Sequence, residues 1–198
     1  MSEPSPEDLV EALEAPLIPY YIALGRFLTA YAHVEGNTLV VLRHCSKVTN
    51  EVGQCLFAGT RASAAIDFIK RIADAQEWTD EQREPLEIVT AQLGEITRAR
   101  NDILHYGTNS TGKDSEWYTT NEFVAHTSNR IRRTKITPDI LGDMTHDCMK
   151  LSAHIVMIGT TADPSYLKVA GPILGASWRY KRAEPDLPRN KNPAPRQE

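Results

Sequence analysis

Apolar residues recur at three-, four- and seven-residue steps in four stretches of the chain, and each stretch predicts an amphipathic helix. We expect these helices from about Leu17 to Ser46, after Gly59-Thr60 with Thr60 as the N-cap, from Thr79 to His105, and from Thr137-Pro138 to about Gly159. Thr79 with Gln82 forms a capping-box pattern, and Pro85 is expected to kink or restart the third helix. The pattern predicts an all-α fold, a four-helix bundle.

The inner faces of these helices predict the core. They comprise Tyr20, Leu24, Phe27, Tyr31, Val34, Thr38, Val41 and Cys45 in the first helix, Ala62, Ala65, Ile66, Ile69, Ile72 and Ala73 in the second, Val89, Leu93, Ile96 and Ile103 in the third, and Leu141, Met144, Cys148, Leu151, Ile155 and Ile158 in the fourth.

A segment of different character lies between the third and fourth helices. Residues 116–124 and 130–136 are rich in β-branched and aromatic side chains, and turn-forming residues separate them, so we expect a two-stranded hairpin over about 116–136. The second strand carries the strongest local basic cluster, which comprises Arg130, Arg132, Arg133 and Lys135. These side chains would track a phosphate backbone, or they would protect a solvated edge strand from aggregation.

The chain is expected to divide into four segments. Residues 1–15 are expected to form a flexible N-terminal segment, 16–162 the bundle with its hairpin, 163–182 a C-terminal docking segment, and 183–198 a Pro-rich polar tail.

Composition limits the classes of function. The 198 residues are 41% hydrophobic, enough for one cored domain, and the net charge of −4 gives no global polybasic signature. The three cysteines are odd in number and scattered, which favours reduced thiols. The acidic N-terminus has no signal-peptide pattern and no stretch of about eighteen apolar residues occurs, so we expect a soluble, cytoplasmic protein without a membrane partner. No cofactor motif is present, and His146, Cys148 and His154 lack the geometry that zinc demands.

The candidate chemistry lies at the end of the third helix, in the sequence Arg100-Asn101-Asp102-Ile103-Leu104-His105-Tyr106-Gly107. Arg100 falls inside the apolar stripe, whereas His105 points outward in the last turn, on the side of Asn101, and Gly107 is a natural left-handed cap. An arginine and a histidine suffice for metal-free phosphodiester cleavage, because one holds the phosphoryl charge and the other moves the proton. The structural alternative makes Arg100 a side chain that extends its charged head to water and His105 a helix-capping residue.

The spacing alone is weak evidence, since Arg26 with His33 and Arg98 with His105 are similarly spaced. Tyr106 and Trp117 are placed to stack on a base, or they belong to the core.

Arg100, Asn101 and His105, at the end of the third of four expected helices, resemble the Arg-x(4 to 6)-His motif of the HEPN superfamily. The segment from Phe27 to Leu42 and the hairpin before the last helix are also similar to small bacterial HEPN-like proteins. The resemblance covers roughly residues 16 to 160.

The resemblance implies a homodimer in which two copies of the motif face each other, and a metal-independent endoribonuclease of a toxin or defence system with an RNA substrate. It also makes an antitoxin or a nucleotidyltransferase a candidate partner. Within this arrangement Arg100 would hold the phosphate, His105 would act as acid or base, Asn101 would orient the ring or bind phosphate, and Glu35 would hold the Arg100 guanidinium. Other members of the superfamily have lost activity, so a catalytically inactive dimeric interaction or nucleic-acid-binding module is the alternative.

Overall fold

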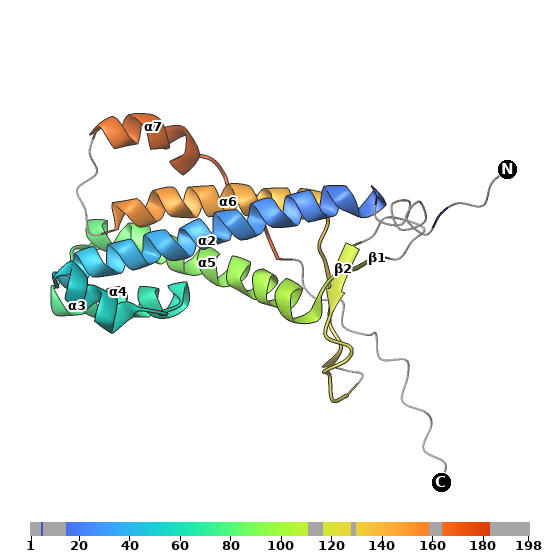
Figure 1. Ribbon diagram of the computed structural model, residues 1–198. Coiled ribbons are helices and arrows are strands. Elements are labelled where there is room, and N and C mark those ends of the chain that lie inside the picture. The colour runs from blue at the N-terminus through green and yellow to red at the C-terminus, as the bar shows by residue number, and fades with distance from the viewer. Residues whose placement is uncertain (1–4, 6–14, 111–116, 128–129, 159–163, 183–198) are drawn as a thin grey trace, which may run out of the picture. The chain divides into compact units, whose positions relative to one another are not determined.

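The computed structural model describes residues 5, 15–110, 117–127, 130–158 and 164–182 (Figure 1). Most of the expected N-terminal segment and the whole tail from 183 onward lie outside the described residues. The backbone forms two compact units, one built from residues 1–96 and 138–180 and the other from 97–137 and 181–198.

All the regular secondary structure in the described part of the first unit is helical. Its elements are η1 (Ala15–Leu17), α2 (Ile18–Ser46), α3 (Asn50–Phe57), α4 (Ala62–Ala75), the first part of α5 (Asp80–Tyr106), α6 (Pro138–Met157) and α7 (Pro164–Leu174). The long helix α2 packs against both α4 and α6, and α7 packs against α6 (Figure 1). The four expected helices therefore correspond to α2, α4, α5 and α6. The protein is mostly helical, as the all-α prediction requires.

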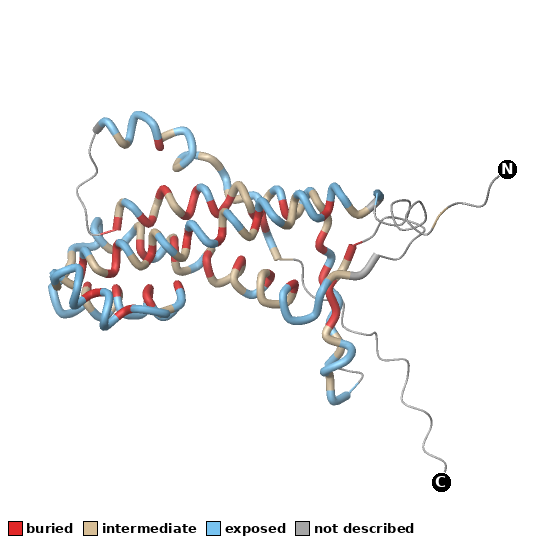
Figure 2. The backbone as a smooth tube through the Cα atoms, viewed as in Figure 1, coloured by how far each residue is buried: buried red, intermediate tan, exposed pale blue. Residues whose placement is uncertain are grey.

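The core of this unit lies along the helix faces that the periodicity predicted. Figure 2 shows buried positions recurring along the helices on the sides where they meet. Of the expected stripe on α2, all but Leu24 are buried, and all the expected residues of α6 are buried. The stripe on α4 is likewise buried apart from Ile72. The helical period thus identified the core faces correctly.

The helix ends test the predicted capping residues. The Thr79 N–H donates to Gln82 Oε1 at 2.9 Å and the Gln82 N–H to Thr79 Oγ1 at 3.4 Å, so the predicted capping box is confirmed. The assignment of Thr60 as an N-cap was wrong, because Arg61 holds the N-cap position of α4 in an extended conformation. The helix α5 also continues through Pro85 without a restart.

Helix α3 was not anticipated. It is only eight residues long, too short for its periodicity to stand out, and its signal is the cap Thr49, whose hydroxyl accepts from the Val52 N–H at 3.4 Å.

A buried carboxylate fastens the C-terminal part of this unit to α6. The Asp147 side chain is fully buried and accepts from the N–H groups of Arg179 at 3.0 Å and Tyr180 at 2.9 Å, and from Gln92 Nε2 of α5 at 3.0 Å. One turn later, the buried Lys150 ammonium donates to the Ala176 carbonyl and lies 4.4 Å from the centre of the Trp178 ring. Residues 176–180 are therefore held by two charged side chains of one helix.

The second unit joins the end of α5, from Thr97 onward, to a small antiparallel sheet. Its strands are β1 (Asn109–Ser110), β2 (Trp117–Thr120) and β3 (Arg133–Lys135), in the order β1-β2-β3. Tyr118 pairs with Lys135 and Thr120 with Arg133, so the expected hairpin has the expected position. The short first strand was not predicted.

The hairpin ladder is shorter than predicted, and a side-chain amide explains why. Asn121 Nδ2 donates to the Arg130 carbonyl at 3.1 Å and its Oδ1 accepts from the Arg132 N–H at 2.7 Å. Beyond Thr120 these two side-chain hydrogen bonds accompany a long backbone bond, from the Asn121 N–H to the Arg132 carbonyl at 3.4 Å. Arg130 and Arg132 therefore lie in the connection rather than in β3, which corrects their predicted place in the strand. Glu116, Ser128 and Asn129 of the predicted hairpin lie outside the described residues.

No helix in the described ranges combines the length and the apolar character needed to cross a membrane.

Candidate functional site

The candidate site begins where α5 ends. Gly107 has a φ of +67°, the left-handed conformation that favours glycine, and its N–H donates to the Ile103 carbonyl at 2.9 Å. This confirms Gly107 as the residue that ends the helix. The main chain then turns into the sheet, which places the last turn of α5 beside β2: the Thr119 hydroxyl donates to the Asp102 carbonyl at 3.0 Å.

Arg100 and Asn101 are joined by a direct hydrogen bond in this turn. Arg100 Nη1 donates to Asn101 Oδ1 at 3.0 Å, and both residues are half-buried. The hydrogen bond fixes one edge of the guanidinium. It uses the Asn101 oxygen alone, so the two Nδ2 hydrogens take no part in it. Asn101 therefore contacts Arg100, and its predicted role in orienting the His105 ring or binding phosphate stays a prediction.

His105 lies on the exposed surface of the last turn, as its position along the helix predicts. Its ring centre is 6.4 Å from that of Tyr106, with the planes inclined by 57°. Among the described residues the imidazole makes no hydrogen bond or ion pair, and it caps no carbonyl of α5. The structural alternative, in which His105 is a capping side chain, therefore finds no support in the described contacts.

Glu35, the predicted partner of Arg100, is half-exposed on α2. It belongs to the first unit and Arg100 to the second, and their pairing stays a prediction.

The four predicted RNA-binding cations Arg130, Arg132, Arg133 and Lys135 are all exposed. Arg133 is partly engaged within the sheet, since its Nη2 lies 3.7 Å from Glu122 Oε2 and its guanidinium 5.2 Å from the centre of the Tyr118 ring. Tyr106, the predicted stacking residue, is 37% exposed, whereas Trp117 is buried and belongs to the core of its unit.

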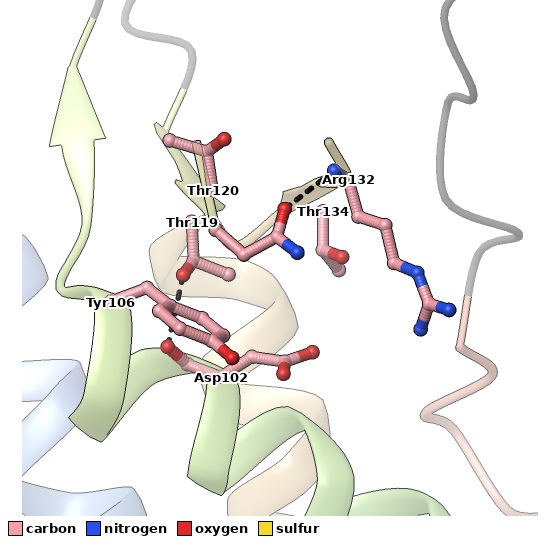
Figure 3. A pocket seen from close by; sticks show the side chains of 7 residues that line it. Asp102, Tyr106, Thr119, Thr120, Arg132 and Thr134 are labelled. Atoms are coloured by element: carbon pink, nitrogen blue, oxygen red, sulfur yellow. Dashed lines mark hydrogen bonds between the residues drawn. The ribbon is translucent and has the colours of Figure 1, made fainter. Parts of the chain in front are cut away.

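A small polar pocket opens between the last turn of α5 and the sheet (Figure 3). Its volume is about 60 Å³, and it is lined by Asp102, Tyr106, Thr119, Thr120, Asn121, Arg132 and Thr134. Tyr106 and Arg132 were predicted to bind RNA, and the structure brings them together at this pocket. Arg100, Asn101 and His105 are outside its lining.

The polar groups of two lining residues differ in their contacts. The Thr120 side chain is 5% exposed, and its hydroxyl has no hydrogen-bond partner among the described residues. Thr119 and Thr120 are neighbours in β2, so their side chains point to opposite faces of the sheet, and the Thr120 hydroxyl points away from Asp102 (Figure 3). The Asp102 carboxylate is held by Arg182, with Oδ2 3.1 Å from Nη2, which leaves lone pairs on both carboxylate oxygens.

Sequence reasoning missed most of this pocket. Asp102 precedes Tyr106 by one helical turn, a spacing that was available from the sequence, but the threonines come from two strands whose register is not encoded locally. Arg182 is 80 positions away from Asp102 along the chain.

A second depression, lined by Val40, Arg43, His44, Lys47, Val48 and Asn50, lies where α2 meets α3 and has a volume of about 460 Å³. Its lining is basic and contains no carboxylate.

The described residues contain no group of three or more histidine, cysteine, aspartate or glutamate side chains that could hold a metal ion. Comparison with protein-family models, with curated proteins and with solved structures found no match for this chain.

Proposed function

We propose that this protein is a cytoplasmic, HEPN-like endoribonuclease that cuts RNA without a metal ion, at the interface of a homodimer. One observation carries the proposal. The exposed His105 imidazole makes no hydrogen bond to any part of the chain that the structure describes, and it follows Arg100, whose guanidinium is held by Asn101 at 3.0 Å. An arginine oriented in this way and a histidine open to solvent are the two groups that phosphodiester cleavage needs.

The reaction uses the ribose as its own nucleophile. The His105 imidazole of one protomer accepts the proton of the 2′-OH while that oxygen attacks the adjacent phosphorus. The Arg100 guanidinium holds the negative phosphoryl oxygens, and the bond from phosphorus to the 5′ oxygen breaks. His105 of the partner subunit, in its protonated form, gives a proton to that oxygen. The products are a 2′,3′-cyclic phosphate and a 5′-OH end.

The exposed cations and Tyr106 supply the binding of substrate. Arg130, Arg132 and Lys135 would contact phosphates, and Tyr106 would stack on a base. Because phosphate contacts release counterions, cleavage at subsaturating RNA should weaken as salt rises. A toxin or defence role with an antitoxin or nucleotidyltransferase partner is part of the same proposal.

A catalytically inactive interaction or nucleic-acid-binding module is the second candidate. The net charge of −4 and the contact between Arg133 and Glu122 favour it, since both lower the positive potential available to RNA.

The decisive test is cleavage of single-stranded RNA in EDTA, with a check of the product ends for cyclic phosphate. DNA should be spared, because it lacks the 2′-OH. Absence of cleavage over a broad panel of RNAs, with the protein folded and dimeric, would favour the inactive module.

A further inference from the structure

The solvent-facing side of α2 carries no charged residue along its middle. Steps of three and four residues place seven exposed positions in one row, which lies opposite the face that α2 buries and which we call the outer row. It comprises Ile18, Ile22, Gly25, Thr29, Ala32, Gly36 and Val40. A solvated helix face is normally charged or polar, so a row of this composition indicates a contact surface.

Large apolar side chains lie open to solvent towards both ends of the outer row. Ile18, Ile22 and Val40, with Tyr21 beside the row, are between 50% and 64% exposed. The one polar side chain of the row needs no water, because Thr29 Oγ1 donates to the Gly25 carbonyl at 2.8 Å. A partner could therefore cover the row without leaving a side-chain hydrogen-bonding group unpaired.

The two glycines of the row have no role in the packing of the chain itself. A Cβ added at Gly25 or at Gly36 would meet nothing within 4 Å outside the adjacent turns of α2. Glycine in a helix interior is less stable than alanine, so its presence here is a cost to the isolated chain. What glycine provides is a gap that lets a second helix approach the backbone closely.

The spacing of the row identifies the occupant, and we propose that two copies of α2 pack antiparallel around Thr29 to form the homodimer. Ile18 and Val40 lie 11 residues on either side of Thr29, and Ile22 and Gly36 lie 7 residues on either side. A two-fold axis at Thr29 therefore sets Ile22 against Gly36 of the partner subunit, and Ile18 against Val40 of the partner subunit. The row is self-complementary, because a bulky side chain on one copy meets a gap on the other.

The size of the row sets the expected strength of the dimer. Residues 18–40 span about 33 Å of helix, and a face about 10 Å wide covers on the order of 330 Å². A standard interface buries about 800 Å² on each partner, so this contact is small. We expect a reversible monomer–dimer equilibrium in the micromolar range. The inference deepens the homodimer of the proposed function and rests on that function in this respect.

Filling the gap at Gly36 tests the contact, with sedimentation of the full chain over micromolar concentrations as the measurement. Gly36→Leu fits the monomer, where the space is open, but overfills the contact with Ile22. The dimer should therefore bind about tenfold more weakly or worse, with the helical circular dichroism retained. Gly142→Leu, at an exposed glycine of α6 with the same open space, is the matched control and should leave the dimer affinity unchanged.

A compensating change separates a lost contact from a damaged helix. Gly36→Leu combined with Ile22→Ala exchanges the bulky and the small position, so it should restore most of the dimer affinity. A dimer that Gly36→Leu leaves unchanged would overturn the inference. A native chain that stays monomeric at hundreds of micromolar would also overturn it, since another occupant would then have to cover the row.

Cross-linking tests the direction of the pairing. In a Cys55→Ser background the remaining cysteines, Cys45 and Cys148, are buried. Thr29→Cys places a thiol at the two-fold axis, within disulfide reach of its own copy, and should give a covalent dimer on mild oxidation. Ile22→Cys should not, because its two copies lie about 21 Å apart along the helix axis. Equal cross-linking of both variants would show a parallel pairing and contradict the proposal.

The two proposals fail in different ways. A dimer that depends on the outer row but does not cleave RNA would sink the ribonuclease and leave the interface standing. RNA cleavage by a dimer that Gly36→Leu does not weaken would sink the interface and leave the ribonuclease standing.

Discussion

Substitution of the buried Asp147 tests how residues 176–180 are held against α6. Asp147→Ala removes an acceptor that receives the N–H groups of Arg179 at 3.0 Å and Tyr180 at 2.9 Å and the Gln92 amide at 3.0 Å. Alanine leaves the two backbone N–H groups without their acceptor, whereas Gln92 Nε2 still has the Tyr180 carbonyl at 3.3 Å. We therefore expect loss of the contact between residues 176–180 and α6.

The magnitude follows from the number of stranded donors. A buried donor without a partner costs about 1–3 kcal/mol, so the two N–H groups set a range of about 2–6 kcal/mol if the segment stays in place. The segment can instead leave α6 and hydrate its N–H groups, which limits the loss. We expect the free energy of unfolding to fall by about 3–5 kcal/mol, the range for breaking a buried charged contact.

Thermal melting followed by circular dichroism measures this loss. For a chain of this size about 1 kcal/mol corresponds to roughly 2–4 °C, so the melting temperature should fall by roughly 6–20 °C. Hydrogen exchange should also accelerate at the amides of Arg179 and Tyr180. Asp143→Ala, one turn earlier on α6 and half-buried without such bonds, is the matched control and should change stability by less than about 0.5 kcal/mol. A loss below about 1 kcal/mol for Asp147→Ala would refute the assignment of Asp147 as the residue that fastens this segment.

Two further predictions concern titratable groups. Burial raises the pKa of Cys45 to about 11 and that of Cys148 to about 12. In the folded protein a thiol reagent at pH 8 should therefore modify only the exposed Cys55 rapidly. Rapid modification of all three cysteines would contradict this prediction. Burial, and next the positive charge of Lys150, lower the pKa of His154 from 6.5. The unfolded chain therefore binds the proton more readily, and the stability contributed by neutral His154 is present above pH 6.5 and lost as the pH falls through 6.5 towards the folded pKa. His154→Gln should flatten the decline in melting temperature between about pH 7.5 and 5.5, and an unchanged decline would show that other groups cause it.

The helices were predictable because their information is local. The helical period identified α2, α4, α5 and α6 together with their buried faces, and the capping box at Thr79 and the glycine end at Gly107 followed from short-range backbone chemistry. The errors at the helix ends have the same origin. Thr60 is a good capping residue by type, yet the position one residue later takes the extended conformation, and the difference is set by packing rather than by the residue itself.

The long-range polar contacts of both units were not predictable, because they join distant parts of the chain. Asp147 bonds backbone groups 32 and 33 positions later, and Asp102 meets Arg182 across 80 positions. Both aspartates appear in the sequence as polar residues on amphipathic helices, a pattern that normally marks a solvated face. The pocket further depends on the register of β2 and β3, which long-range pairing fixes.

Cleavage of a single-stranded RNA in EDTA by the full-length protein and by His105→Ala tests the central claim most directly. The matched control is His33→Ala, which removes an exposed histidine of α2 that follows Arg26 at a similar spacing. The proposal predicts cyclic phosphate ends from the native protein and from His33→Ala, and a loss of at least about 10²-fold in rate for His105→Ala with an unchanged melting temperature. Undiminished cleavage by His105→Ala would contradict the proposal, because the activity would then come from other groups.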